Sequence, residues 1–499
     1  MNSHYLAHKR VLVVGLGVTG QAVVKAIESL PADQRPDTLK TLDARNPEAN
    51  FSQAVDVPVN EFDLAVASPG WSPHSDILVA FAQGSVPIIS EIELAWQLRV
   101  NQTSTGTPAP WIGVTGTNGK TTTVSMVESI LKADGRNAVA VGNVGRPVIE
   151  VALDPSVDTV ALELSSFQLH YTHTVSLHAA AVLNIAADHI DWHGTFENYA
   201  NDKGRIFDRV KTACIYNVSD ERTRSLVEQA DVKEGAIAVG FTLGSPDRSQ
   251  VGLVEDVLVD RAFHMDRTDP SRHSHAAELG ELADLQHLAG EGHPIPPHIV
   301  ANALAAGALT RAVGVSAQAV RDGLRQYQPG GHRIAEVTTA PVFGGSDAGV
   351  VTFVDDSKAT NAHAALASLG SFRDSSVVWI AGGLAKGAQF DQLVSKTKSK
   401  LRAVVVIGVD QEPMRSALVQ VDSQVPVTYI AAMSEANVKR GGAEVMSEAV
   451  RVAYEHAGPG DVVLMAPACA SMDQFASYAD RGDAFASAAQ SLSQGALDK

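Results

Sequence analysis

The chain has 499 residues, of which 45% are hydrophobic and 19% charged; this balance excludes wholesale disorder and predicts about three domains. The formal net charge of −17 disfavours nucleic acid and anionic membranes as partners, although local basic residues can still hold an anionic substrate. The two cysteines, Cys214 and Cys469, are too few for a disulfide scaffold. The sequence shows no signal-peptide core and no apolar run of the ~18 residues that a membrane span needs. We therefore expect a cytoplasmic protein without membrane insertion.

Short β-branched runs alternate with helical patterns in the N-terminal part of the chain. Strands are expected at residues 11–14, 39–42 and 64–67, with a helix over 18–30. This alternation predicts a parallel, doubly wound sheet. The segment NQTSTGTPAP, residues 101–110, has the Thr, Pro and Gly content of a linker. A second α/β unit follows, with strands expected at 111–114 and 159–162 and a helix at 124–132.

The pattern loosens between residues 240 and 297, where we expect surface loops with His264, His273 and His275 solvated rather than bound to a metal. A helix is expected at 299–313, ended by Gln-Pro-Gly-Gly at 328–331. A third α/β unit has strands expected at 351–354, 377–380, 403–407, 427–430 and 462–465. The predicted fold is therefore α/β with three domains, over residues 1–108, 109–329 and 330–499.

The strongest local motif is GVTGTNGKTTT at residues 113–123, between a strand and a helix. Gly116 and Gly119 allow the backbone N–H groups to curl around phosphate oxygens, and the helix N-terminus favours negative charge. Lys120 can reach the β- and γ-phosphates, and the Thr121 hydroxyl can bind Mg²⁺. A strict Walker A motif has Gly where this chain has Val114, so the motif is a compact variant.

A second glycine-rich turn, GLGVTG at residues 15–20, follows a strand and opens a helix, and Asp43 ends the next strand. This pattern fits a dinucleotide-binding fingerprint. Any nucleotide with a pyrophosphate suits such a helix N-terminus, so NAD and a UDP-sugar are both candidates, and a turn without a ligand is a third interpretation.

Four polar residues follow the phosphate-binding loop: Asn143, Glu163, His189 and Lys203. Glu163 comes directly after an apolar run, so we expect it at the carboxyl end of a strand, where α/β proteins gather ligands. Its carboxylate could complete a Mg²⁺ site with Thr121. Each residue also has a purely structural interpretation: an ion pair for Glu163, a helix cap for His189 and a solvated lysine for Lys203.

Together these segments resemble the Mur ligase family over nearly the whole chain. TGTNGKTTT resembles its ATP loop, ELSSFQL its Mg²⁺-binding strand end and DHIDWHG its histidine segment. The later segments HR at 332–333, DDSKATN at 355–361, GGLAK at 382–386 and PACASMDQF at 467–475 resemble the D-glutamate-adding member. The resemblance implies an ATP-dependent ligase that joins D-glutamate to UDP-N-acetylmuramoyl-L-alanine through an acyl phosphate, in peptidoglycan precursor synthesis. It also implies a Rossmann-like N-terminal domain, a central ATPase domain and a Rossmann-like C-terminal domain in a monomer.

The resemblance also implies roles for individual residues. Catalytic roles fall on Lys120, Glu163, His189 and Lys203. Two Mg²⁺ ions would be held by Thr121, Glu163, His189 and a carbamylated Lys203. ATP would contact Gly116, Thr117, Asn118, Gly119, Lys120, Thr121, Thr122, Asn302, Arg333 and Asp356. Substrate contacts would also fall on Gly17, Val18, Thr19, Arg45, Ser68, Asn143, Ser165 and Gln168. Of these, Thr19 and Arg45 would lie near the uridine, and Asn143 would lie near the Mg²⁺ held by Thr121 and Glu163. D-glutamate would contact Lys358, Thr360, Lys386, Ser471 and Tyr478.

The chain departs from the family pattern at two places. Ile299 follows His298 where the family usually has Asn, so only Asn302 is carried over on the adenine side. Ala44 stands beside Arg45 where a hydroxyl residue is common, which affects the uracil contacts. The competing hypotheses are another ligase of the superfamily, such as a folylpolyglutamate synthase, a nicotinamide-dependent dehydrogenase built on GLGVTG, and a P-loop regulatory ATPase without a ligase reaction.

Overall fold

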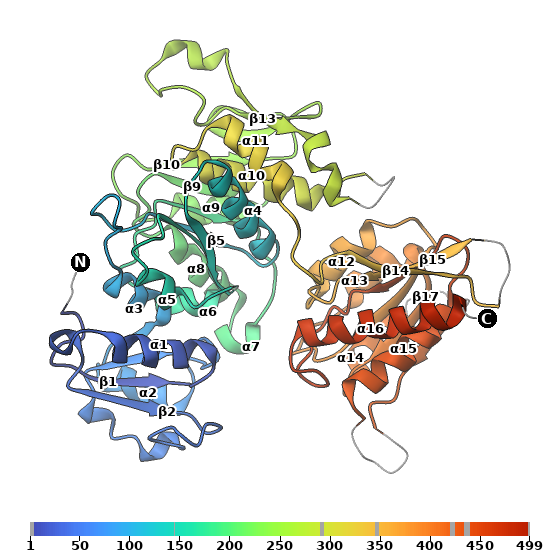
Figure 1. The fold of residues 1–499 in the computed structure, drawn as a ribbon, viewed down its shortest axis with the longest axis horizontal. Coiled ribbons are helices and arrows are strands. Elements are labelled where there is room, and N and C mark those ends of the chain that lie inside the picture. The colour runs from blue at the N-terminus through green and yellow to red at the C-terminus, as the bar shows by residue number, and fades with distance from the viewer. Residues whose placement is uncertain are drawn as a thin grey trace. The chain divides into compact units, whose positions relative to one another are not determined.

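The computed structural model describes residues 4–143, 145–289, 294–344, 349–419, 425–433 and 440–497. The chain divides into two compact units, Met1–Gln328 and Pro329–Lys499 (Figure 1). The first unit contains a four-stranded and a nine-stranded sheet, and the second unit contains a six-stranded sheet. The predicted α/β class is confirmed. Within the described ranges, no helix is long and apolar enough to cross a membrane.

The N-terminal sheet is parallel throughout, in the order β2-β1-β3-β4. Its strands are β1 (Arg10–Val14), β2 (Thr38–Leu42), β3 (Leu64–Ala67) and β4 (Ile88–Ser90), and its helices are α1 (Val18–Ser29), α2 (Asp76–Gln83) and α3 (Glu91–Leu98). Val11 and Val13 pack into one hydrophobic cluster, whereas Leu12 and Val14 pack into another. Both faces of the sheet are therefore covered, which explains the unbroken apolar run of β1.

The central sheet has the order β13-β12-β11-β10-β9-β8-β5-β7-β6. Its strands are β5 (Trp111–Thr115), β6 (Ala138–Gly142), β7 (Thr159–Glu163), β8 (Ala179–Val182), β9 (Ala213–Asn217), β10 (Ile237–Phe241), β11 (Gln250–Val254), β12 (Val257–Asp260) and β13 (Ala277–Glu281). Its helices are α4 (Lys120–Ala133), α5 (Val148–Ala152), α6 (Ser166–His170), α7 (Ile190–His193), α8 (Phe196–Gly204), α9 (Glu221–Glu228), α10 (Pro297–Arg311) and α11 (Ala317–Gln326). Helices α4, α10 and α11 lie together in Figure 1 and share one hydrophobic cluster.

The prediction of surface loops between residues 240 and 297 is wrong at three short strands, β11, β12 and β13. Strands β11, β12 and β13 extend the central sheet there, the last two in antiparallel pairs. The strands are short and border a segment rich in charge, His and Pro, so their apolar pattern is weak. His264 and His275 hydrogen-bond to the carbonyl oxygens of Arg272 and Ser271. Residues 290–293 of the expected loop lie outside the described residues.

The sheet of the second unit has the order β14-β15-β19-β16-β17-β18. Its strands are β14 (Ala335–Pro341), β15 (Val350–Asp355), β16 (Val377–Gly382), β17 (Leu401–Ile407), β18 (Val427–Tyr429) and β19 (Val462–Met465). Its helices are α12 (Ala362–Gly370), α13 (Asp391–Thr397), α14 (Glu412–Leu418), α15 (Gly442–His456) and α16 (Tyr478–Leu497). All five predicted strands are present, whereas the antiparallel edge strand β14 was not predicted because only one of its residues is buried.

Candidate active site

The phosphate-binding loop connects β5 to α4, as the sequence predicted. Gly116 and Gly119 have φ angles of +150° and +86°, which favour glycine at both positions. A Cβ on Gly119 would lie 2.5 Å from Asn302 Oδ1, so the side chain of Asn302 on α10 packs directly against the loop. The structure therefore brings Asn302, predicted from the resemblance alone, to the predicted ATP loop.

Two lysines meet at one carbonyl oxygen of this loop. Lys120 Nζ donates to the carbonyl oxygens of Gly116 and Thr117, at 2.9 Å each. Lys203 Nζ donates to the same Gly116 oxygen at 2.9 Å and to Thr115 Oγ1 at 3.4 Å. Both ammonium groups therefore lie against the predicted phosphate-binding loop.

Lys203 is buried, with 2% of its surface exposed, which rules out the interpretation as a solvated lysine. Burial lowers the pKa of its amine well below the ordinary value, and the positive charge of Lys120 lowers this pKa further. The negative charges of Asp188 and Glu163 act in the opposite direction but are outweighed. An amine whose pKa is lowered is more often neutral, and only a neutral amine can attack CO₂. The chemistry of carbamylation therefore suits this position.

Glu163 ends β7 beside the loop and is 1% exposed. Its Oε1 accepts a hydrogen bond from Asn143 Nδ2 at 3.1 Å, whereas its Oε2 is buried without a hydrogen-bond partner among the described residues. A buried carboxylate oxygen of this kind fits a cation. The described residues contain no group of three or more His, Cys, Asp or Glu side chains that could hold a metal alone. Mg²⁺ usually binds one or two carboxylates together with substrate phosphates.

His189 precedes α7 and has a positive φ of 52°. Its ring lies against Phe167, with centroids 4.8 Å apart, and its Nε2 is 3.7 Å from Asp188 Oδ2. The segment before it is tied to the phosphate loop, because Ala186 N donates to Thr117 Oγ1 at 2.9 Å. The loop and the histidine segment therefore form one connected structure.

Ser165 and Gln168, predicted to contact a substrate, hydrogen-bond to each other at the start of α6. Gln168 Oε1 accepts from the Ser165 N–H, and Ser165 Oγ accepts from the Gln168 N–H, at 2.9 and 3.2 Å. This reciprocal pair is a helix cap. The hydrogen bonds of Ser165 and Gln168 therefore stabilise the start of α6. Any contact with a substrate would be made in addition to these bonds.

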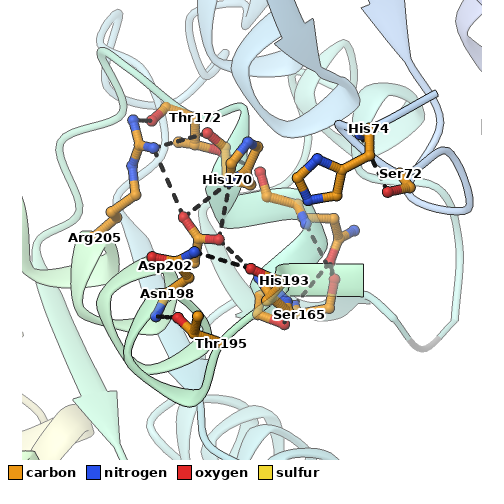
Figure 2. Close-up of polar contacts among 12 residues, drawn as sticks. Ser72, His74, Ser165, His170, Thr172, His193, Thr195, Asn198, Asp202 and Arg205 are labelled. Carbon is orange, nitrogen blue, oxygen red and sulfur yellow. Dashed lines mark hydrogen bonds and ion pairs between the residues drawn. The ribbon is translucent and has the colours of Figure 1, made fainter. Parts of the chain in front are cut away.

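A buried hydrogen-bond network that was not predicted from the sequence supports α8, the helix that carries Lys203 (Figure 2). The Asp202 carboxylate accepts hydrogen bonds from His170 Nδ1 and His193 Nδ1, each at 2.9 Å, and His193 Nε2 lies 2.9 Å from Ser166 Oγ. Burial alone would raise the pKa of Asp202, but these hydrogen bonds hold it below its ordinary value. The network joins α6, α7 and α8, and the only sequence signal for it was that His193 belongs to the segment DHIDWHG.

The N-terminal glycine-rich turn has the expected geometry. Gly15 has a φ of +91°, and its carbonyl oxygen accepts from Ser68 Oγ at 2.8 Å. Asp43 accepts hydrogen bonds from the backbone N–H groups of Leu16 and Arg45, at 2.6 and 2.7 Å, and these bonds lower its pKa. The carboxylate that would bind a ribose in a dinucleotide enzyme therefore holds the turn together. Gly17, Val18, Thr19, Arg45 and Ser68 lie at the carboxyl ends of β1, β2 and β3.

The second unit collects the remaining predicted residues at the carboxyl ends of β15, β19 and β16, which are neighbours in the sheet. Lys358 Nζ lies 3.9 Å from the centre of the Tyr478 ring. Burial raises the pKa of Asp356 to about 7, and the charge of Arg333 opposes this rise. Thr360 follows β15, Lys386 follows β16 and Ser471 follows β19.

Comparison with known proteins identifies the family. The model of the Mur ligase middle domain matches residues 114–310, and that of the Mur ligase glutamate ligase domain matches residues 342–469. The UDP-N-acetylmuramoylalanine--D-glutamate ligase of Streptomyces avermitilis is 47% identical over 97% of this chain and 98% of that protein. The chain belongs to the Mur ligase family. A Mur ligase of the same name from Bifidobacterium adolescentis is 43% identical over 97% of each chain.

The fold of this Mur ligase is shared with solved structures. The MurF ligase of Thermotoga maritima, solved in complex with ADP, is 15% identical with a TM-score of 0.51, covering 99% of this chain and 97% of that one. At this identity the likeness concerns the fold. The family resemblance predicted from the motifs is confirmed, and the dehydrogenase and regulatory ATPase hypotheses are not favoured.

Proposed function

We propose that the chain is a cytoplasmic, monomeric ligase that uses ATP and Mg²⁺ to join D-glutamate to UDP-N-acetylmuramoyl-L-alanine, releasing ADP and phosphate. The observation that carries the proposal is the meeting of Lys120 and Lys203 at the Gly116 carbonyl oxygen in a chain of this family. The names of the relatives support the amino acid and the UDP substrate. Two buried free cysteines support a reducing compartment.

The proposed reaction has two steps. The alanyl carboxylate of the UDP substrate first attacks the γ-phosphorus of ATP, forming an acyl phosphate and ADP. The amine of D-glutamate then attacks the acyl carbon, loses a proton and displaces phosphate, which leaves the amide. Activation is needed because a free carboxylate is a poor acylating agent for an amine.

The chain's own residues would offset the negative charge that these reactants bring together. The backbone N–H groups after Gly116 would bind the phosphates, and Lys120 would stabilise charge on the transferring phosphoryl group. Thr121, Glu163, His189 and a carbamylated Lys203 would hold Mg²⁺, which when bound neutralises phosphate charge. His189 would position the metal and the substrate rather than act as a base.

The substrates have distinct proposed contacts. The UDP substrate would lie at the N-terminal turn, on Gly17, Val18, Thr19, Arg45 and Ser68, with Asn143, Ser165 and Gln168 nearer the reaction. ATP would be held by the loop residues and Asn302, with Arg333 and Asp356 of the second unit. D-glutamate would contact Lys358, Thr360, Lys386, Ser471 and Tyr478.

Phosphate release should require ATP, Mg²⁺, UDP-N-acetylmuramoyl-L-alanine and D-glutamate together. The reason is that the acyl phosphate accumulates unless the amine removes it. The measurement is phosphate release with each component omitted in turn and with L-glutamate, L-lysine or meso-diaminopimelate in place of D-glutamate. Turnover with one of these three and none with D-glutamate would overturn the amino-acid assignment.

The N-terminal turn should bind a uridine nucleotide rather than NAD. Both Asp43 oxygens are already engaged by backbone N–H groups, so the acid that usually binds a dinucleotide ribose is committed to the turn. In a titration, UDP-N-acetylmuramoyl-L-alanine should bind and NADH should not compete with it. Tight NADH binding that no UDP-sugar displaces would reverse this assignment.

A further inference from the structure

A fully buried arginine lies beneath the loops of the second unit. Arg481, near the start of α16, is 0% exposed. Its Nε donates to Ser357 Oγ at 3.0 Å and its Nη2 to the Ser357 carbonyl oxygen at 2.9 Å. Its Nη1 donates to the Cys469 carbonyl oxygen at 3.1 Å. The side chain therefore joins the loop after β15 to the loop after β19.

No carboxylate forms an ion pair with Arg481 among the described residues of this unit. Asp355 is engaged by His332 Nδ1 at 2.6 Å, and Asp473 accepts a hydrogen bond from a backbone N–H. Burial raises the pKa of the Cys469 thiol to about 12, so this neighbour is neutral near pH 7. Burial also lowers the pKa of Arg481 to about 10, which still leaves the guanidinium charged. The charges of Asp473 and Asp355 oppose this lowering, although neither carboxylate pairs directly with the guanidinium. A buried cation that has no direct ion pair is unfavourable and calls for a physical reason.

A third loop reaches the same guanidinium. A Cβ on Gly383, after β16, would lie 3.2 Å from Arg481 Nη1 and 2.5 Å from the Ala470 carbonyl oxygen. Leu384 and Ala470 exchange two backbone hydrogen bonds, of 2.9 and 3.1 Å. The three loops and the first turn of α16 carry all the residues proposed for the amino acid: Lys358, Thr360, Lys386, Ser471 and Tyr478.

We propose that Arg481 is the positioning residue of the amino-acid site: it fixes the three loops and supplies a buried positive charge that the carboxylates of the acidic amino acid balance. This rests on the assignment of these loops to D-glutamate. Arg481 lies beneath the loops and does not touch the substrate, because its five N–H groups face the protein interior. Its charge still acts on the substrate, since electrostatic interactions reach further where water is excluded. The amino-acid site thus gains positive potential without an exposed arginine.

The test compares Michaelis constants for the three substrates in variants of the full chain. Arg481→Gln should raise the KM for D-glutamate at least tenfold while the KM values for ATP and UDP-N-acetylmuramoyl-L-alanine change less than twofold. Arg481→Lys keeps the charge but loses the forked hydrogen bonds, so it should recover part of the D-glutamate KM. The matched control is Arg402→Gln, at the amino end of β17, which loses an ion pair with Asp461 and should leave the D-glutamate KM within twofold.

Ser357→Ala provides a second variant if Arg481→Gln does not fold. It removes the hydroxyl that accepts from Arg481 and donates to the Tyr478 carbonyl oxygen at 2.8 Å, and should raise the D-glutamate KM about threefold. A D-glutamate KM within twofold of wild type in either folded variant, or an equal rise in all three KM values, overturns the proposal. Failure of the proposed function is seen separately, as wild-type protein that releases no phosphate in response to D-glutamate.

Discussion

Lys120→Ala should lower the rate of phosphate release at saturating substrates by about a hundredfold or more and leave the fold intact. Lys120 Nζ lies 2.9 Å from the carbonyl oxygens of Gly116 and Thr117, at the loop that would hold the phosphates. The charge it opposes grows as the phosphoryl group is transferred, so its loss falls on the transition state and costs on the order of 3 kcal/mol. Because the position is half-buried at the start of α4, where alanine is a good helix former, we expect little loss of stability.

Lys132→Ala is the matched control for Lys120→Ala, because it removes the same charge from the same helix. Lys132 is exposed and pairs with Glu128 at 2.7 Å, four residues earlier. Surface ion pairs of this kind contribute about 0.3–0.5 kcal/mol to stability, so Lys132→Ala should stay folded. Because Lys132 lies away from the phosphate loop, the rate of phosphate release should stay within twofold of wild type. The measurements are the rate of phosphate release and the midpoint of thermal unfolding. A Lys120→Ala rate within threefold of wild type would contradict the proposed role.

Much of the phosphate site could be predicted from sequence because its residues are contiguous. Gly116, Gly119 and Lys120 lie within five positions, and a strand-to-helix connection with that spacing has few other uses. Glu163 was placed correctly at a strand end because the apolar run before it is unbroken. These inferences need only local geometry, which the sequence encodes directly.

Burial of polar residues could not be predicted, because it depends on distant parts of the chain. Lys203 stands in the polar run NDKGR, yet β5 and the phosphate loop cover it. Arg481 stands in YADRGD and is likewise covered by the loops after β15 and β19. Asn302 was placed only through the family resemblance, because α10 lies far along the chain from Gly119. Strand β14 could not be predicted for a related reason: it forms by pairing with β15, and most of its side chains lie outside the core, so its sequence carries little apolar pattern.

Lys203→Ala should be nearly inactive, and a small carboxylic acid should restore part of its activity. An unmodified ammonium group has no lone pair with which to bind Mg²⁺ and would repel the ion. Reaction of the neutral amine with CO₂ gives a carbamate and a proton, which replaces a cation with two hard oxygen donors. Mutation of residues that only hydrogen-bond to metal ligands already lowers metal affinity or activity about 10–100-fold. Loss of a direct ligand should therefore lower the rate of phosphate release by at least about a hundredfold.

The buried position of Lys203 makes the rescue specific. The side chain is 2% exposed, so truncation to alanine leaves a space that faces the Gly116 carbonyl oxygen and the Thr115 hydroxyl. Formate, acetate or propionate can place an anionic oxygen there, whereas acetamide and ethylamine of similar size cannot. The measurement is phosphate release by Lys203→Ala against the concentration of each additive, with wild type and the solvent-exposed Lys233→Ala as controls. Recovery of activity with the carboxylic acids alone supports a carbamylated Lys203. Equal recovery with the neutral amide would mean that the additive only fills the vacated space. Full activity of Lys203→Ala without any additive would show that Lys203 does not belong to the site.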